Sequence, residues 1–545
     1  MARYKKTIIF IWVCMFFISV LNGCQGADSL DAADEKLSAG SFEVEESEKG
    51  GSITLYSTVV DTTHPLFTKN IFMKDHTYMI FDKFIIVDEK GQCQESIARE
   101  WSVSDDCLTW RYVIKEDIKW HDGTSLMAED VLFTINTIIN NPDCLYAKLV
   151  ENIKNVYTES GNVIIMELKK EDSLTPEKMF FPVIPKHIYE NVNKNSKIKE
   201  VPIGSGPYRC SSFDAAKQMI LTKNPAWNTI DKGGLDLPYL KEIIINFNSK
   251  TNSPQKQFNE NETFILYAEN EEAKSYIGRN DLNIYKYNTG EFTYINFNLS
   301  SYFFKDKMKR KAFTYCVDIR TIAKEVAASD VSLSLMAIAP EHYLNSGDSQ
   351  NSIYDKQKAF TLFSEAGCGI IDGKVHHSSA NTDEPIILTL LINNNNEERA
   401  LLAEKIRLQL KDIGIYVSVL SLNWDDYIEK INSGKGFDFA IMGINLPYTP
   451  DFDLLYATDS NFNTAKYSNP DTDVILSQFK RAKNEEEKQL VAENLRKNLL
   501  EEMPYMGLFF KGEYVIYNKQ LRGDIKCFRE DKFYDIARWY IRAPS

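Results

Sequence analysis

The sequence predicts a protein of the α/β class. From Ser52 almost to the C-terminus, stretches with the alternation of β-strands follow stretches with helical periodicity, without an internal repeat. The chain has 545 residues, of which 43% are hydrophobic. That is enough apolar material for a large core and too much length for one ordinary domain. We therefore expect two or three packed lobes.

The first 23 residues have the layout of an export signal. Three basic residues precede an apolar stretch from Ile8 to Leu21, which is too short to span a membrane stably. The stretch ends in Leu21-Asn22-Gly23-Cys24. This ending resembles a lipobox, so we expect Cys24 to be diacylated and to become the first residue after cleavage. A plain signal peptide and a short signal anchor are the alternatives.

Residues 24–51 are expected to form the lipidated cysteine and a disordered tether. Gln25 to Gly51 contains eight acids, two lysines and almost no large apolar residues. Such a segment cannot bury enough surface to offset the entropy of ordering. An acylated cysteine followed by an acidic spacer would hold a folded body away from a membrane while leaving it mobile.

The charge and the cysteines exclude several classes of function. The formal net charge is -14, and removal of the basic leader would leave about -17, a sign that repels phosphate backbones and argues against a nucleic-acid partner. The seven cysteines of the body have no C-x-x-C spacing, so a thiolate zinc site is not expected. Buried use as small hydrophobic residues is the favoured interpretation, with one long-range disulfide left open.

The clearest local pattern is a βαβαβ unit in the C-terminal half. An apolar strand, Ile387 to Ile392, precedes a helix from Glu397 to Ile413 that Gly414 ends. An alternating strand starts at Ile415, a short helix from Trp424 to Ile431 ends at Gly434, and Phe437 to Gly443 forms a buried strand. Such units form right-handed parallel sheets that bind ligands beyond the carboxyl ends of their strands. The pattern therefore places a ligand near residues 443–448.

A further helix is predicted from Asn484. Glu487 stands three residues later as a capping partner, and Val491, Leu495 and Leu499 lie on one face. Pro504 ends the pattern.

A stretch of about 35 residues, from Ile97 to Val131, includes the run Lys119-Trp120-His121-Asp122-Gly123-Thr124. This stretch is the most specific of several blocks that resemble the peptide- and nickel-type solute-binding proteins of ABC importers, bacterial extracellular solute-binding protein family 5. It departs from the family at Cys107, where members usually carry Gly, which indicates a strained turn. Further blocks follow in the same order: Pro185 to Ile188, Gly204 to Tyr208, Asn224 to Trp227, Pro238 to Leu240, Asn298 to Arg320 and Tyr467 to Pro470.

The resemblance implies a two-lobed fold like that of the periplasmic binding proteins, of type II, with an extra subdomain and a ligand cleft between the lobes. Lobe one would comprise residues 52–70, 181–293 and 508–545, with an inserted subdomain at 71–180. Lobe two would comprise residues 294–507. Binding in this family shifts an equilibrium between open and closed forms.

The resemblance also gives the candidate ligand-binding residues. Trp424 stands at a family position that lines the side-chain pocket, and Val59, Val60 and Asp61 stand on the facing edge of lobe one. The loop Ile444, Asn445, Leu446, Pro447 and Tyr448 completes the set. An aromatic shelf accepts varied apolar groups, and free backbone groups of Asn445 and Leu446 could pair with an extended ligand. Core packing at the start of its helix is the alternative for Trp424.

The residue that anchors a peptide's amino group in peptide-binding members is absent from this loop. The family's Gly-Trp pair is followed by an Asp whose position here is Pro447, and the Trp position is Ile444. A cation without its carboxylate in a closed cleft would cost several kcal/mol. Binding through a free amino terminus therefore requires Asp451 or Asp453 to take this role from a shifted loop.

Other polar motifs have simpler explanations than catalysis or metal binding. His121-Asp122 lacks further ligands at useful spacing, and the family likeness makes it part of a turn. His376-His377 lies in a polar stretch that is typical of a loop. Gly204-Ser205-Gly206 is not a nucleophile elbow and indicates a tight crossing. Adjacent acids such as Glu129-Asp130 point apart on a helix.

The sequence thus predicts a lipid-anchored receptor, not an enzyme, without metal or cofactor. We expect it to sit, as a monomer, on the extracellular face of the cell membrane of a Gram-positive-type bacterium. Its partners would be a peptide or other small organic solute and an ABC permease with its ATPase. A sensor or adhesin on the same fold is the main alternative, and nickel-chelate binding is a weaker one.

Overall fold

The computed structural model describes residues 49–159, 161–192, 200–227, 229–247, 253–326, 331–345, 354–377 and 384–542. The expected signal peptide, Cys24 and most of the tether lie outside these residues. The end of the expected tether belongs to the folded body instead. Lys49 forms an ion pair with Asp231 at 3.2 Å, and the Gly50 carbonyl accepts a hydrogen bond from the Ile541 amide at 2.8 Å. The body therefore begins by Lys49, before Ser52.

Lobe one contains a four-stranded mixed sheet. Its strands, in spatial order, are β1 (Ser52–Ser57), β10 (Glu242–Phe247), β9 (Gln218–Lys223) and β8 (Tyr208–Asp214). The β1–β10 pair is parallel and the other pairs are antiparallel. Helix α1 (Ile71–Ile80) packs against β1 and β8, so it belongs with this sheet and not with the inserted subdomain, where the sequence had placed residue 71 onward.

The inserted subdomain has its own antiparallel sheet. The strand order is β4 (Ala98–Val103), β5 (Thr109–Ile114), β7 (Val163–Leu168) and β6 (Ile153–Glu159), and helix α2 (Ala128–Ile139) packs on β6 and β7. A single hydrophobic core joins this subdomain to lobe one. Both ends of the folded body contribute to it, because Ile53 and Trp539 are buried in the same cluster.

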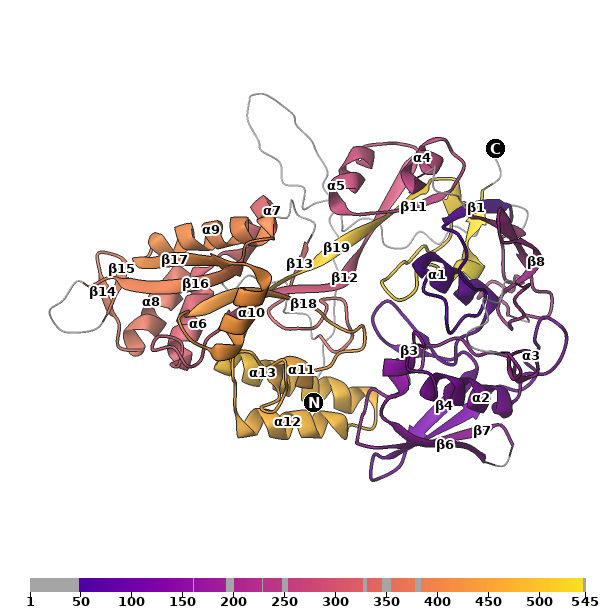
Figure 1. The fold of residues 1–545 in the computed structure, drawn as a ribbon, viewed down its shortest axis with the longest axis horizontal. Coiled ribbons are helices and arrows are strands. Elements are labelled where there is room, and N and C mark those ends of the chain that lie inside the picture. The colour runs from indigo at the N-terminus through magenta and orange to yellow at the C-terminus, as the bar shows by residue number, and fades with distance from the viewer. Residues whose placement is uncertain are drawn as a thin grey trace, which may run out of the picture. The chain divides into compact units, whose positions relative to one another are not determined.

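Two long strands connect the lobes. Strands β12 (Leu282–Phe297) and β19 (Tyr505–Asn518) pair side by side along most of their length (Figure 1). One end of each lies in the core of lobe one, through Tyr287 and Val515, and the other lies in the core of lobe two, through Ile295 and Leu508. The expected lobe boundaries at 293/294 and 507/508 fall inside these strands.

The βαβαβ unit predicted for lobe two is confirmed. It consists of β16 (Ile386–Asn393), α9 (Glu397–Lys411), β17 (Ile415–Leu422), α10 (Trp424–Ser433) and β18 (Phe439–Asn445). Strand β16 is parallel to both β17 and β18. Gly414 and Gly434 take positive φ angles of 87° and 63° where the helices end. Glycine adopts this backbone region without strain, which is why the two residues stop the helices.

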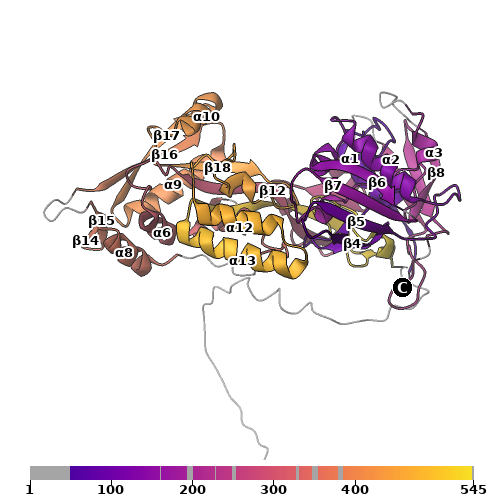
Figure 2. The same ribbon diagram turned by 90° about the horizontal axis from the view of Figure 1, so that it is seen from below.

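Further helices cover lobe two and the hinge strands. They are α6 (Lys307–Cys316), α7 (Ile319–Val326), α8 (Lys356–Glu365), α11 (Asp453–Tyr456), α12 (Pro470–Lys480) and α13 (Glu485–Glu502). The predicted cap of α13 is confirmed, since the Glu487 amide donates to the Asn484 side chain at 2.9 Å. In Figure 2, α13 runs toward the inserted subdomain. Its Lys488 forms a buried ion pair with Glu177 there.

Short elements complete the described fold. They are β2 (Ile86–Val87), β3 (Cys93–Gln94), α3 (Lys186–Tyr189), α4 (Pro254–Asn259), β11 (Ile265–Ala268), α5 (Asn270–Ala273), β13 (Val331–Leu333), β14 (Gly369–Ile371), β15 (Lys374–His376), β20 (Leu521–Arg522) and β21 (Tyr540–Ile541). Within the described ranges, no helix is long and apolar enough to cross a membrane.

Two local expectations from the sequence are also confirmed. Cys107 has a positive φ of 59°, the strained turn that its departure from the family pattern indicated. The seven cysteines of the body are free thiols, five of them buried. Most of these cysteines therefore pack in the core as small apolar side chains. The long-range disulfide that the sequence left open is absent among these residues.

Candidate functional site

The carboxyl ends of the parallel strands in lobe two carry an arginine that the sequence did not single out. Arg399, in the first turn of α9, donates from Nη1 to the side-chain oxygen of Asn393 at 2.5 Å. A Cβ atom added to Gly443 would lie 2.6 Å from its Nη2 atom, so the guanidinium lies directly over the end of β18. Arg399 has no ion-pair partner within the described ranges, which leaves its charge available to a ligand.

Trp424 lies at the same edge, as the first residue of α10. Its side chain is 49% exposed and stacks on Tyr427 with ring centroids 5.8 Å apart. Tyr427 is fully buried and its hydroxyl donates to the Ile441 carbonyl on β18 at 2.8 Å. The indole is therefore a supported, half-exposed surface, and the alternative of core packing for Trp424 is wrong.

On lobe one, the candidate residues after β1 differ in what they offer. Val59 is exposed, but Val60 is 1% exposed and belongs to the lobe-one core, so its side chain is not available to a ligand. Adjacent residues of an extended segment point to opposite sides, and only one of the two valines can face outward. The Asp61 carboxylate accepts from Thr68 and from the Thr62 and Lys69 amides, at 2.6 to 2.8 Å, and holds its own loop.

The loop after β18 is more engaged with the protein than the sequence indicated. Leu446 is 6% exposed, its amide donates to the Gly290 carbonyl at 2.9 Å, and its carbonyl accepts from Arg529 at 2.6 Å. Neither backbone group is free for a ligand, so the expectation for Leu446 is wrong. Asn445 is exposed opposite Glu291 of β12.

The sheet still offers an open backbone edge just before this loop. Strand β18 pairs with β16 only through Phe439 and Ala440, whereas its pairing with β12 continues to Asn445. In the described part of the chain, residues 442–445 therefore have a strand on one side and none on the other. Ile444 is partly buried against the core of lobe two.

A small cavity of about 40 Å³ lies where the lobes meet at the hinge. Pro447, Tyr448 and Asp451 of lobe two line it, together with Gly290 of β12 and Arg529 of lobe one. The Tyr448 hydroxyl donates to the Asp88 carbonyl, and its ring lies 5.3 Å from that of Phe528. This volume holds a few water molecules at most, so a larger ligand would have to displace Tyr448 or bind outside the cavity.

The two acids that could replace the missing amine anchor are in different situations. Asp453 forms an ion pair with Lys480 of α12. Asp451 lines the hinge cavity and forms no ion pair within the described residues. Burial, reinforced by the nearby Asp453 carboxylate, raises the pKa of Asp451. A carboxylate of this kind is stabilised by an incoming cation.

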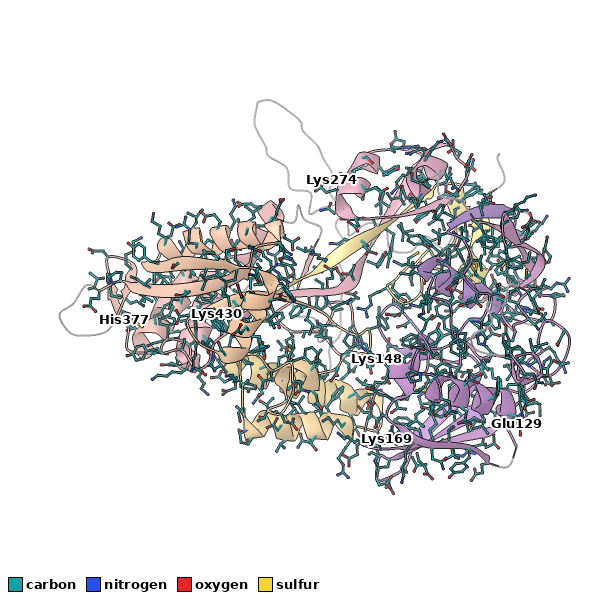
Figure 3. All side chains as sticks on the ribbon, viewed as in Figure 1. Glu129, Lys148, Lys169, Lys274, His377 and Lys430 are labelled. Carbon is teal, nitrogen blue, oxygen red and sulfur yellow. The ribbon has the colours of Figure 1, made fainter. Side chains whose placement is uncertain are left out.

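The motifs set aside at the sequence level have structural roles. His121 accepts from the Gly204 amide and lies 3.1 Å from the Gly206 carbonyl, and so fixes the Gly204–Gly206 crossing against the end of α1. Figure 3 shows Glu129 and His377 far apart, on α2 and at the outer end of lobe two. Within the described ranges, no three His, Cys, Asp or Glu residues form a group that could hold a metal ion.

Sequence reasoning missed two residues of the site, Arg399 and Arg529. It left open the role of a third, Asp451. A basic residue in the first turn of an amphipathic helix normally indicates a solvated surface. Only the distance between Arg399 and Gly443, 44 positions apart, shows that the charge faces the strand ends. Arg529 lies in an irregular segment with no motif, so no sequence signal could have identified it.

Comparison with known proteins gives a consistent result. The model of bacterial extracellular solute-binding proteins, family 5, matches residues 92–466. The oligopeptide-binding protein AppA of Bacillus subtilis is 24% identical over 99% of this chain and 100% of its own length. Its structure with a nonapeptide covers 91% of this chain and 100% of its own, with a TM-score of 0.54.

Two further solved structures share the fold. The unliganded open form of the murein tripeptide-binding protein MppA is 18% identical and has a TM-score of 0.74, covering 91% of this chain and 98% of its own. NikZ of Campylobacter jejuni, in complex with Ni(L-His), is 21% identical with a TM-score of 0.57, covering 90% and 99%. The two-lobed fold expected from the sequence is therefore present. From the family model, which spans well over half of its length, the chain belongs to family 5 of the bacterial extracellular solute-binding proteins.

Proposed function

We propose that this protein captures a peptide or peptide-like organic solute outside the cell and delivers it to an ABC permease. It would be held at the outer face of the membrane by a lipid on Cys24. The observation that carries the proposal is the hinge, because β12 and β19 pass from one lobe core to the other. Their pairing shifts register between Asn288 and Phe292, at the lobe junction. A local irregularity in a two-stranded connection is where a hinge bends most easily.

The names of relatives support a peptide as the solute. AppA is named as an oligopeptide-binding protein, and the relative DppE of the same bacterium as a dipeptide-binding protein. The protein is a binding protein and not an enzyme, as befits its family.

The site can accept an extended peptide along β18. A peptide bound as an extra strand beside residues 442–445 would form hydrogen bonds with the open backbone edge. These backbone bonds contribute affinity whatever the side chains of the peptide are. Trp424 would support an apolar side chain from the same edge. The Arg399 guanidinium matches the planar shape of a ligand carboxylate.

Asp451 would receive the amino group of the peptide in place of the residue that Pro447 replaces. It lies eight residues beyond Gly443, which faces Arg399, so the two charges flank the loop at opposite ends. A peptide amine would neutralise a carboxylate whose burial disfavours its charged form. Tyr448 would have to move to admit it.

The decisive experiment is native mass spectrometry of the purified protein with a defined peptide mixture, before and after N-acetylation of the peptides. We expect one peptide per protein and loss of binding on acetylation. Asp451→Asn should weaken binding about tenfold or more, because it removes a charge-assisted interaction. Asp453→Asn is the matched control, since that acid is already paired with Lys480. Equal effects of the two variants would exclude Asp451 as the anchor.

Closure and anchoring are tested separately. Small-angle scattering should show a smaller radius of gyration when a peptide that the protein binds is added. If no peptide reduces the radius of gyration, the transport proposal is refuted. Cys24→Ala should release the protein from the membrane into the medium. Retention of the variant on cells would exclude a lipid on this cysteine.

A sensor or adhesin on the same fold is the second candidate, and the contacts between the lobes favour it. Tyr448 bonds to Asp88 and Lys488 pairs with Glu177 across the lobes, and such contacts would keep solutes out of the cleft. Deletion of the gene separates the candidates: an importer component is required for uptake of its labelled peptide, whereas a sensor is not.

A further inference from the structure

Lobe one contains a cavity much larger than the one at the hinge. Its volume is about 640 Å³, and none of its lining residues belongs to lobe two. The walls come from the end of α1 and the segment after it, residues 94–96 and 115–119 of the inserted subdomain, and the C-terminal segment 531–538. Ser205, Pro207, Ala226, Trp227, Thr229 and Leu237 complete the lining. A volume of this size accommodates a small organic molecule. The residues proposed to bind peptide are absent from its lining.

The lining carries an excess of negative charge. It includes six acids and four bases. Three of the bases are already paired with acids of the lining: Lys83 with Asp531, Lys115 with Glu95 at 3.4 Å and Arg538 with Asp535 at 2.6 Å. The fourth, Lys119, donates to Ser125 at 2.7 Å. Asp82, Glu116 and Asp117 are left without an ion-pair partner among the described residues.

Asp82 is the most buried of the three acids without an ion-pair partner. Its carboxylate accepts a hydrogen bond from the Trp227 indole nitrogen at 3.3 Å. Burial raises the pKa of Asp82, and the Ser205 hydroxyl, the Trp227 indole and the more distant Lys115 ammonium partly oppose that effect. Two neutral donors orient the carboxylate, and Lys115 forms its ion pair with Glu95 instead.

Ser205 places a hydroxyl group beside this carboxylate. Its side chain lines the cavity and is 1% exposed. The hydroxyl favours the charged form of Asp82, which is the form that an organic cation would meet.

Aromatic side chains also line the cavity. Tyr78, Phe81, Trp227, Phe533 and Tyr534 contribute to the walls. The ring of Tyr78 is already covered by the Lys83 ammonium, at 3.9 Å from its centroid. Aromatic faces attract both apolar groups and cations, so the walls suit the body of a ligand whose charged end meets Asp82.

From this arrangement we propose that the lobe-one cavity is a second binding site, which takes a small organic cation with an apolar or aromatic body. The ammonium or guanidinium group pairs with the Asp82 carboxylate, which the Trp227 indole and the Ser205 hydroxyl orient. The body lies among the aromatic side chains. This site is independent of the peptide site between the lobes and does not rest on the transport proposal.

The test is calorimetric titration of the purified protein with three probes that share an indole ring. Tryptamine carries an ammonium group, tryptophol a neutral hydroxyl and indole-3-acetate a carboxylate. We expect tryptamine to bind at one site, tryptophol to bind about tenfold more weakly because the charge-assisted bond is lost, and indole-3-acetate not to bind. No saturable binding of tryptamine at millimolar concentration, or equal binding of tryptamine and tryptophol, would overturn the proposal.

A variant pair locates the binding. Asp82→Asn keeps the shape of the side chain and should abolish the preference for tryptamine over tryptophol. Glu129→Gln removes an exposed acid on α2 outside the cavity and should leave the preference unchanged. Preference retained in Asp82→Asn would overturn the assignment. If this variant does not fold, the comparison of the three probes on the unmodified protein still decides.

Discussion

Lys488 of α13 and Glu177 of the inserted subdomain form an ion pair in which both side chains are nearly inaccessible, with 7% and 4% of their surfaces exposed. Tyr343 also donates to the same carboxylate, at 2.7 Å. The pair connects the subdomain to lobe two at a point separate from the hinge strands. It therefore acts as a latch between segments that are 311 residues apart in the chain.

Replacing Lys488 by Met should destabilise the protein and loosen the lobes. The substitution leaves a buried carboxylate without its cation, which typically costs about 3 kcal/mol of unfolding free energy. Urea denaturation measures the loss, and small-angle scattering should show a larger radius of gyration without ligand. Lys483→Met is the control, because its partner Asp105 is fully exposed. An unchanged radius would show that Lys488 is not a latch.

Trp424→Ala should lower peptide affinity by about 1 to 3 kcal/mol, the usual cost of removing an aromatic anchor. Its half-exposed side chain adds little to the core, so the unfolding midpoint should stay close to that of the unmodified protein. Calorimetry with the peptide identified by mass spectrometry provides the measurement. Tyr302→Ala, which removes a 71% exposed ring elsewhere on lobe two, serves as the control. Equal losses in both would remove Trp424 from the site.

Arg399→Gln should weaken the binding of peptides with a free C-terminal carboxylate about tenfold. Binding of the corresponding peptide amides should hardly change, because only the charged carboxylate forms an ion pair with the guanidinium. The readout is the ratio of dissociation constants for the acid and the amide of one peptide. Arg407→Gln, on the exposed part of the same helix and paired with Glu404, is the matched control. A ratio that does not change in Arg399→Gln contradicts the proposed role.

The buried histidines should lower the free energy of unfolding as the pH falls from about 6.5 to about 4, whereas the Asp75 carboxyl, whose pKa burial raises to about 7, acts in the opposite direction. Burial lowers the pKa of His121 to about 4, and that of His64, His76 and His342 to about 3, from 6.5. Each folded-state pKa is below the unfolded value, so the unfolded chain binds protons first and the stabilisation is lost with falling pH. His121→Gln should reduce this loss by about 2 kcal/mol. An unchanged slope in denaturation experiments would contradict the assignment.

At position 107, replacement of Cys by Gly should preserve the stability of the protein, whereas replacement by Val should lower it. The φ of 59° at this position is unfavourable for side chains branched at Cβ, so Cys107→Val should be less stable than Cys107→Gly by about 1 to 2 kcal/mol. The thiol also contacts the Arg481 carbonyl at 3.3 Å, and Gly loses that contact while relieving the strain. Urea midpoints of the two variants compare them directly. A more stable Val variant would show that the turn is not strained.

Local patterns allowed the central part of lobe two to be predicted from the sequence. The unit from β16 to β18 has strong periodicity, short connections and glycines at both helix ends, so each signal is contained within a few neighbouring residues. The cap at Asn484 and the turn at Cys107 are local for the same reason. The family likeness supplied the arrangement of the lobes, which periodicity alone does not give.

The candidate site was predicted less well because its geometry depends on distant segments. Val60 and Leu446 are buried by contacts that no neighbouring residue indicates, and Leu446 is held by Arg529, 83 positions away. Lys488 and Glu177 each occupy positions that are typical of solvated charge. Such pairs form only when the lobes are assembled, so the amino-acid types do not reveal them.

The meeting of the chain ends in lobe one bears on how the two cores are completed. Ile53, near the start of the folded body, and Trp539, six residues from the last, lie in one core, and Gly50 is bonded to Ile541. The main core of lobe two, by contrast, is drawn from one continuous stretch between Ile295 and Phe509. The core of lobe two can therefore form from one stretch of chain, whereas the core of lobe one needs segments from both ends of the folded body. Removal of the segment around Trp539 would thus leave the core of lobe one incomplete without removing any residue from that of lobe two.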